Sequence, residues 1–151
     1  MVKKIALAAD HAGFEEKEKI KKTLDEIGVE YDDMGTMSPD SVDYPDYAEK
    51  VADAVSSGQY EQGLLVCGSG TGMAIAANKV KGVRAAVAWN EDIARLAREH
   101  NDANVLSLPA RFVPEEESAK IVKAFFAAGF EGGRHARRVD KITDIEKKDF
   151  K

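Results

Sequence analysis

The chain has 151 residues, which is enough for one domain with one hydrophobic core, so we expect a single domain over residues 1–151. Hydrophobic residues make up 44% of the chain and charged residues 32%, a composition that excludes a disordered tail, a collagen-like fibre and a membrane-spanning protein. The formal net charge of −5 gives no general attraction to nucleic acid or anionic lipid, and we expect neither as a partner.

Apolar runs alternate with helical patterns along the chain. The first half predicts, in order, a strand at 5–9, a helix that ends near Gly28, a strand at 29–34, a loop at 35–44, a helix from Pro45 to about Ser56, and a strand at 63–67. The second half predicts a helix at about 73–79, a strand at 83–88, a helix at 91–99, a strand at 104–108, a helix from Pro114, and a last helix from about Arg134.

Five strands that alternate with helices indicate an α/β fold with a parallel sheet, helices on both of its faces, and an additional C-terminal helix. Ligands of such folds bind beyond the carboxyl ends of the strands. The residues that follow each strand are therefore the place to look for chemistry.

The chain contains one cysteine, Cys67, which cannot form an internal disulfide. A lone thiol is typical of a reducing compartment, so we expect a cytoplasmic protein. The apolar run at 5–9 is shorter than the roughly 7–15 residues of a secretion signal, and it predicts a strand instead.

The strongest local pattern is the turn Cys67-Gly68-Ser69-Gly70-Thr71-Gly72, between a strand and a helix. Three glycines allow backbone N–H groups to approach a phosphate or a developing oxyanion closely. The alternative to an anion-binding turn is a tight strand-to-helix connection in which the glycines only provide flexibility. A dinucleotide site is disfavoured, because the third glycine is misplaced for G-x-G-x-x-G and the turn follows the third strand rather than the first.

Cys67 directly precedes these amides. A helix N-terminus should lower the pKa of the thiol, which makes Cys67 a candidate base or nucleophile. The alternative is a buried cysteine that acts only as a small hydrophobic residue.

Histidine and arginine residues supply the remaining candidates. His11 follows the first strand, next to Asp10, whereas His100 ends a helix. Arg134 and Arg138 are four residues apart on one helix face, where two guanidinium groups can hold a phosphate. Each has an alternative role as a surface or capping residue. The third histidine is His135; no histidine pair has the H-E-x-x-H spacing and there is one thiol, so we expect no metal site.

These residues together resemble the ribose-5-phosphate isomerase B family, which includes the galactose-6-phosphate isomerase subunits. The resemblance covers nearly all of residues 5–145. Its motifs occur in order: Asp10-His11-Ala12-Gly13, Asp43-Tyr44-Pro45, Cys67-Gly68-Ser69-Gly70-Thr71-Gly72, Ala76-Ala77-Asn78-Lys79, Gly82-Val83-Arg84-Ala85, the segment from His100 to Leu106, and Gly132-Gly133-Arg134-His135 with Arg138-Val139.

The resemblance implies a Rossmann-like three-layer α/β/α sandwich with a five-stranded parallel sheet. It implies a homodimer with shared active sites, able to pair into a tetramer, and cofactor-free interconversion of ribose 5-phosphate and ribulose 5-phosphate through an enediolate. Two alternatives stay open. One is an isomerase of a hexose 6-phosphate such as allose 6-phosphate, and the other is a non-catalytic module that binds a sugar phosphate.

The resemblance also implies roles for individual residues. Cys67 would be the base, Ser69 would assist proton transfer among the sugar oxygens, His100 would open the furanose ring, and Asp10 would lie near its oxygens. The amides of Gly68, Gly70, Thr71 and Gly72 would hold the enediolate oxygens. Tyr44 and Asn101 would line the sugar, and the phosphate would be bound by His11, Arg111, Arg134 and Arg138. The partner chain would supply His100, Asn101, Arg134 and Arg138 to the site of Cys67.

The sequence departs from the family pattern in three places. Ser69 stands where threonine is usual, Thr71 where an aliphatic residue is common, and Pro109-Ala110 where glycine is frequent before Arg111. All of the catalytic and phosphate-binding positions occur in one chain, which argues against a galactose-6-phosphate isomerase subunit.

Overall fold

The structure is a computed structural model that describes residues 2–150. Its strands form one parallel sheet in the order β2-β1-β3-β5-β4. Strand bounds are Lys4–Ala9 for β1, Glu30–Asp33 for β2, Gly63–Cys67 for β3, Ala85–Val87 for β4 and Val105–Pro109 for β5. The predicted α/β fold with a five-stranded parallel sheet is therefore confirmed.

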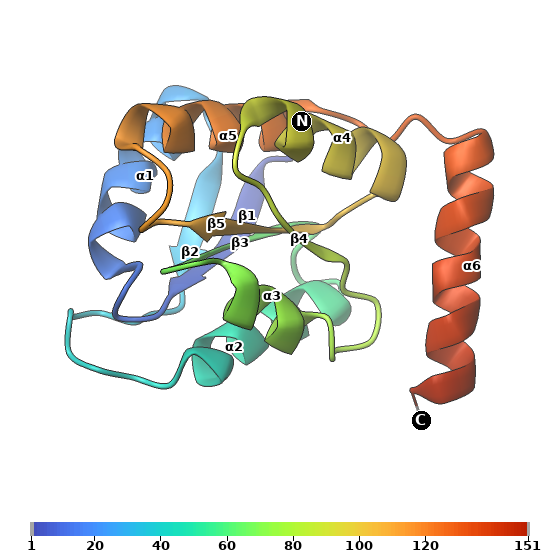
Figure 1. Cartoon of the computed structure of the whole chain (residues 1–151), viewed down its shortest axis with the longest axis horizontal. Coiled ribbons are helices and arrows are strands. Elements are labelled where there is room, and N and C mark those ends of the chain that lie inside the picture. The colour runs from blue at the N-terminus through green and yellow to red at the C-terminus, as the bar shows by residue number, and fades with distance from the viewer. Residues whose placement is uncertain (1, 151) are drawn as a thin grey trace.

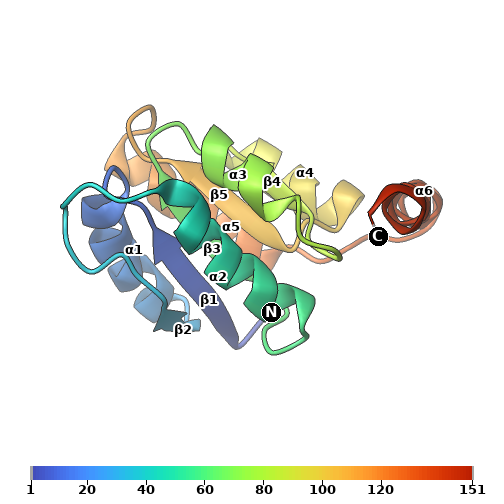
Figure 2. The same ribbon diagram turned by 90° about the horizontal axis from the view of Figure 1, so that it is seen from below.

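Helices cover both faces of the sheet (Figures 1 and 2). Their bounds are Phe14–Glu26 for α1, Tyr44–Ser56 for α2, Thr71–Ala77 for α3, Glu91–Asn101 for α4, Glu115–Ala127 for α5 and Arg134–Asp149 for α6. Helices α1, α4 and α5 form one layer and α2 and α3 the other, so that the fold is a three-layer sandwich.

The three central strands are buried on both faces, which explains why they read as continuous apolar runs. Their side chains divide between two hydrophobic clusters. Leu7, Leu64 and Leu106 face the layer of α1, α4 and α5, whereas Leu65 and Val105 face α2 and α3. All five side chains are fully buried.

Helix α6 stands apart from the sandwich, at the end of the molecule away from the carboxyl ends of the strands (Figures 1 and 2). Only His135 and Val139 of this helix are buried. Ile142 and Ile145 are 46% and 60% exposed, so the apolar face of the helix is largely uncovered within one chain.

Two predicted elements differ in extent. Strand β4 is three residues long rather than six, since it lies at the sheet edge and the Arg84 N–H bonds the side chain of Asn104 instead of a strand partner. Helix α3 begins at Thr71 rather than Met73 because Gly70, with φ +77°, already turns the chain into the helix. Among the described residues, no helix is long and apolar enough to cross a membrane.

Candidate active site

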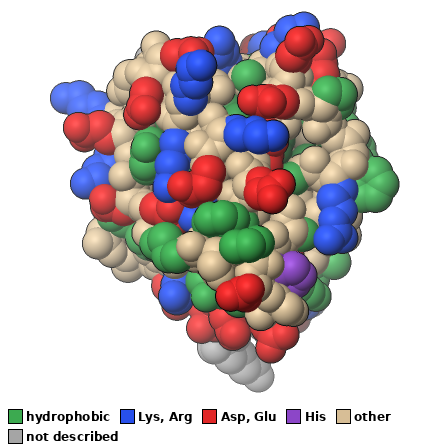
Figure 3. Space-filling model, turned by 90° about the vertical axis from the view of Figure 1, so that its left-hand side faces the viewer, with side chains coloured by type: hydrophobic (Ala, Val, Ile, Leu, Met, Phe, Trp, Pro, Cys, Tyr) green, Lys and Arg blue, Asp and Glu red, His purple; other side chains and the backbone are tan. Residues whose placement is uncertain are grey.

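A cavity of about 400 Å³ opens at the carboxyl ends of the strands. Figure 3 shows this side of the molecule, where basic and acidic side chains are interspersed and a histidine reaches the surface. The cavity brings together eight of the predicted site residues, with Ala12 beside them: Asp10, His11, Tyr44, Cys67, Gly68, Ser69, Gly72 and Arg111.

Cys67 ends β3, and its thiol faces the glycine turn. The Gly70 N–H donates to Sγ at 3.1 Å, and the Thr71 N–H donates to Oγ of Ser69 at 3.3 Å. Gly70 adopts φ +77°, a left-handed conformation that side chains other than glycine rarely take. The turn therefore curls its amides around the end of the strand, with the exposed Ser69 hydroxyl at its rim.

The predicted lowering of the Cys67 pKa is wrong. Burial of the thiol raises its pKa, and the negative charge of Asp10 raises it further, while the N–H groups of Met73, Gly70 and Ser69 act in the opposite direction. Desolvation outweighs the amides because Cys67 is only 4% exposed. In one chain the thiol is thus the dominant form at neutral pH.

Asp10 and His11 occupy the turn between β1 and α1. Oδ1 of Asp10 accepts a hydrogen bond from the Gly13 N–H at 2.9 Å, which fixes the buried carboxylate beside the thiol. Nδ1 of His11 accepts from the Val42 N–H at 3.1 Å. The imidazole proton then lies on Nε2, which is available as a donor to an anion.

Tyr44 and Arg111, which also line the cavity, each pack against a glycine of the turn. A Cβ on Gly72 would lie 2.7 Å from the Tyr44 ring, and a Cβ on Gly68 would lie 3.2 Å from Cδ of Arg111. The Arg111 N–H also donates to the carbonyl of Gly68 at 3.0 Å. Pro109 and Ala110 thus still allow Arg111 to reach the cavity, although glycine is frequent there in the family.

Ser107 is a residue that the sequence analysis missed. Its fully buried hydroxyl donates to the carbonyl of Gly70 at 2.6 Å, which holds in place the residue whose own N–H donates to Cys67. A lone serine inside the apolar run Val105–Pro109 was the available signal, because a buried hydroxyl needs a partner.

Of the remaining predicted residues, Gly70 and Thr71 belong to the turn beside the cavity, whereas four others do not reach it within one chain. His100 and Asn101 end α4, and Arg134 and Arg138 are exposed on α6, at the far end of the molecule from the glycine turn. Asn101 instead lines a separate cavity beside α6. Their supply by a partner chain stays a prediction.

His100 and His135 stack face to face, with ring centroids 4.1 Å apart and 7° between the ring planes. Glu131 lies against both, with Oε1 3.3 Å from Nε2 of His100 and 3.6 Å from Nε2 of His135. These are metal-ligand types that the sequence spacing did not predict to meet. However, lone pairs of parallel rings point in parallel rather than toward one ion, and Arg134 and Arg138 are near.

The fold and the cavity together define a class of protein: an α/β protein with a thiol, a carboxylate and a turn of backbone amides at a site that can hold an anion. The chain matches the ribose/galactose isomerase family over residues 5–142. It is 48% identical over 147 residues to ribose-5-phosphate isomerase B of Escherichia coli, a match that covers 97% of this chain and 99% of that protein.

Solved structures of similar proteins agree. Ribose-5-phosphate isomerase B of Clostridium thermocellum superposes with a TM-score of 0.93 at 50% identity, covering 96% of this chain and 98% of that one. The Mycoplasma genitalium enzyme, solved with bound ribulose-5-phosphate, gives 0.91 at 47% identity, covering 95% and 96%. The chain belongs to the ribose/galactose isomerase family, which confirms the family and the Rossmann-like fold expected from the sequence.

Proposed function

We propose that this protein is an aldose–ketose isomerase that interconverts ribose 5-phosphate and ribulose 5-phosphate. The observation that carries the proposal is the cavity in which Cys67, Asp10 and the glycine turn meet. Relatives named ribose-5-phosphate isomerase B, and the ribulose-5-phosphate complex of one of them, favour this substrate over a hexose 6-phosphate.

The reaction moves a proton between C1 and C2 of the open-chain sugar. Cys67, as the thiolate, takes the proton from one carbon and returns it to the other. A carbon next to a carbonyl is weakly acidic, so the enediolate that forms must be stabilised. The amides of Gly68, Gly70, Thr71 and Gly72 supply that stabilisation, and the Ser69 hydroxyl moves a proton between the two oxygens. No step requires a cofactor or a metal.

The phosphate group orients the sugar against Cys67. Nε2 of His11 and the guanidinium of Arg111 are its partners within the chain, and Tyr44 lines the sugar. Binding energy from the phosphate, which does not react, positions C1 and C2 against the base. On an acidic protein, a local concentration of positive charge is required to hold this anion.

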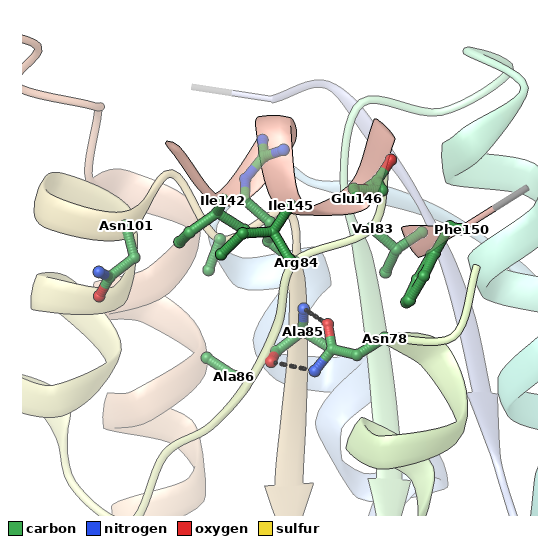
Figure 4. Close-up of a pocket in the computed structure, with 11 residues that line it drawn as sticks. Asn78, Val83, Arg84, Ala85, Ala86, Asn101, Ile142, Ile145, Glu146 and Phe150 are labelled. Carbon is green, nitrogen blue, oxygen red and sulfur yellow. Dashed lines mark hydrogen bonds between the residues drawn. The ribbon is translucent and has the colours of Figure 1, made fainter. Parts of the chain in front are cut away.

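A second copy of the chain completes the site in this proposal. The chain carries His100, Asn101, Arg134 and Arg138 at the end away from its own Cys67, so another copy must deliver them. The uncovered apolar face of α6 supports this arrangement. Figure 4 shows Ile142 and Ile145 of α6 lining a groove of about 460 Å³ together with Val83 and Ala86. An apolar groove of this kind suits a helix of the partner.

Turnover tests the function directly. Purified protein in EDTA is supplied with ribose 5-phosphate or allose 6-phosphate, and ketose formation is measured. We expect a higher kcat/KM for the pentose phosphate. A higher value for the hexose phosphate would assign the alternative substrate. Ligand-induced thermal stabilisation without any turnover would instead identify a binding module.

A further inference from the structure

The loop between α5 and α6 places a carboxylate against the side chain that we assign to ring opening. The Glu131 N–H donates to the carbonyl of Glu99 at 3.0 Å, which ties this loop to the last turn of α4. The neighbouring Gly132 and Gly133 have φ of +71° and +58°, so the chain turns sharply into α6. As a result Oε1 of Glu131 lies 3.3 Å from Nε2 of His100.

A carboxylate at one ring nitrogen determines what the other nitrogen can do. A carboxylate 3.3 Å from Nε2 favours the tautomer that carries its proton on Nε2 and leaves the lone pair on Nδ1. The negative charge also stabilises the imidazolium that forms when Nδ1 accepts a proton. His100 is partly exposed, so its free edge can meet a ligand outside the chain.

His135 completes the support of His100. Its ring stacks on that of His100 and restricts rotation of the imidazole. Burial lowers the pKa of His135, a proton on neighbouring His100 and the guanidinium of Arg134 would lower it further, and Glu131 acts in the opposite direction. A neutral His135 leaves the charge of Glu131 directed at His100, and Arg134 and Arg138 are the residues of α6 whose charges act on His135.

We propose that Glu131 is a positioning residue for ring opening: it fixes the tautomer and orientation of His100, which lies within 3.3 Å on the same chain. This inference rests on the proposed function, because it concerns a step that precedes isomerisation. Nothing in the motif spacing singled out Glu131.

The step is a proton relay about the anomeric carbon. Nδ1 of His100 takes the proton from the O1 hydroxyl, and the electron pair of that bond forms the C1=O1 double bond. The bond from C1 to the ring oxygen O4 breaks, with its electron pair leaving on O4. His100 returns the proton to O4, so the cyclic hemiacetal becomes an aldehyde and a hydroxyl without any other reactant.

Only one of the two sugars needs this step. Ribose 5-phosphate closes through O4, whereas ribulose 5-phosphate cannot form a furanose, since its O5 is esterified by phosphate. Isomerisation of ribose 5-phosphate therefore reports ring opening together with proton transfer. Proton removal from C1 of ribulose 5-phosphate reports the work of Cys67 alone.

The test compares both rates in Glu131→Gln, a substitution that keeps the shape of the side chain and removes its charge. Formation of ribulose 5-phosphate is measured from ribose 5-phosphate. Proton removal is measured by NMR in D₂O from ribulose 5-phosphate, as deuterium entering C1 plus aldose formed. We expect the first kcat/KM to fall roughly 10- to 100-fold, part of the roughly 10²–10⁴-fold that a positioned acid or base supplies. The rate of proton removal from ribulose 5-phosphate should stay within about twofold of that of the unmodified protein.

Controls separate the possible outcomes. Glu117→Gln removes an exposed carboxylate on α5 that pairs with Lys120, and it should change neither rate. His100→Ala should show the same selective loss as Glu131→Gln, and Cys67→Ala should lose both rates. An undiminished forward rate in Glu131→Gln, or an equal fall in both rates, would overturn the assignment. Absence of both activities in the unmodified protein would instead refute the proposed function.

Discussion

Two opposing effects act on the pKa of Cys67. Burial and the carboxylate of Asp10 raise its pKa, whereas three backbone N–H groups, two of the turn and one of α3, stabilise the thiolate. Of these three amides, only that of Gly70 also serves the enediolate in our proposal. The thiolate is therefore the minor form in the free chain, and in our proposal the positive charge of arginines supplied by a partner chain would favour it.

This balance predicts the pH dependence of the forward reaction. The raised pKa of Cys67 means that the thiolate share grows as the pH rises from neutral, so kcat/KM should increase with pH, with a log–log slope approaching 1 below that pKa. A steady-state pH profile with ribose 5-phosphate checks this. A kcat/KM that is flat from about pH 7 to 9 would contradict a base with a raised pKa.

The direction of the Cys67 pKa shift could not be predicted from the sequence. The position of Cys67 before a glycine turn indicates stabilising amides, but the depth of burial depends on Tyr44, Arg111 and the strands that surround the end of β3. These segments are far apart in the chain. Most of the cavity residues, in contrast, directly follow predicted strands, whereas Tyr44 was expected only from the family resemblance.

At the scale of elements, the site depends on how closely α1 approaches β3. Gly13 stands where α1 begins, and a Cβ there would lie 2.1 Å from the carbonyl oxygen of Val66. Val66 is fully buried in a central strand, so its backbone cannot move aside cheaply.

Gly13→Ala should therefore destabilise the protein by about 1–3 kcal/mol or more, the usual cost of overpacking. The loss should appear as a fall of several degrees in Tm, measured by calorimetry or circular dichroism. Gly129→Ala is the matched control, since a Cβ at Gly129 meets no atom within 4 Å and its φ is not left-handed. Equal Tm values for the two variants would contradict the close approach.

Elements buried on both faces were the best predicted. Residues 63–67 and 105–109 form strands nearly where their apolar runs begin and end, because burial on two faces leaves a continuous signal. The edge strand β4 was overestimated, since Val83 and Arg84 leave the ladder at its start. Contacts that join distant loops, such as Glu131 with His100, leave no local pattern and needed the fold.

At the scale of the whole molecule, four of the predicted site residues lie at the end of the fold away from the Cys67 of their own chain. The cavity that contains Cys67 opens at the carboxyl ends of the strands, and Arg134 lies on α6 at the opposite end of the molecule. Two copies that exchange these ends would each complete the site of the other, which also gives the apolar face of α6 a partner.

Mixing of inactive variants tests this exchange. Cys67→Ala and His100→Ala are each expected to isomerise ribose 5-phosphate poorly. After the two variants are unfolded and refolded together, mixed dimers should contain one intact site, and up to about a quarter of the unmodified activity should return if half of the dimers are mixed. Activity that never exceeds the sum of the separate variants would contradict shared sites.

The most direct test of the central claim is the rate of ribulose 5-phosphate formation by Cys67→Ala, measured in EDTA beside the unmodified protein and the folded control Glu117→Gln. A base that moves the proton between C1 and C2 cannot be replaced by a methyl group. We predict a fall in kcat of roughly 10²–10⁴-fold or more, with Tm changed little and the control unaffected. Undiminished turnover in Cys67→Ala would contradict the assignment of Cys67 as the base.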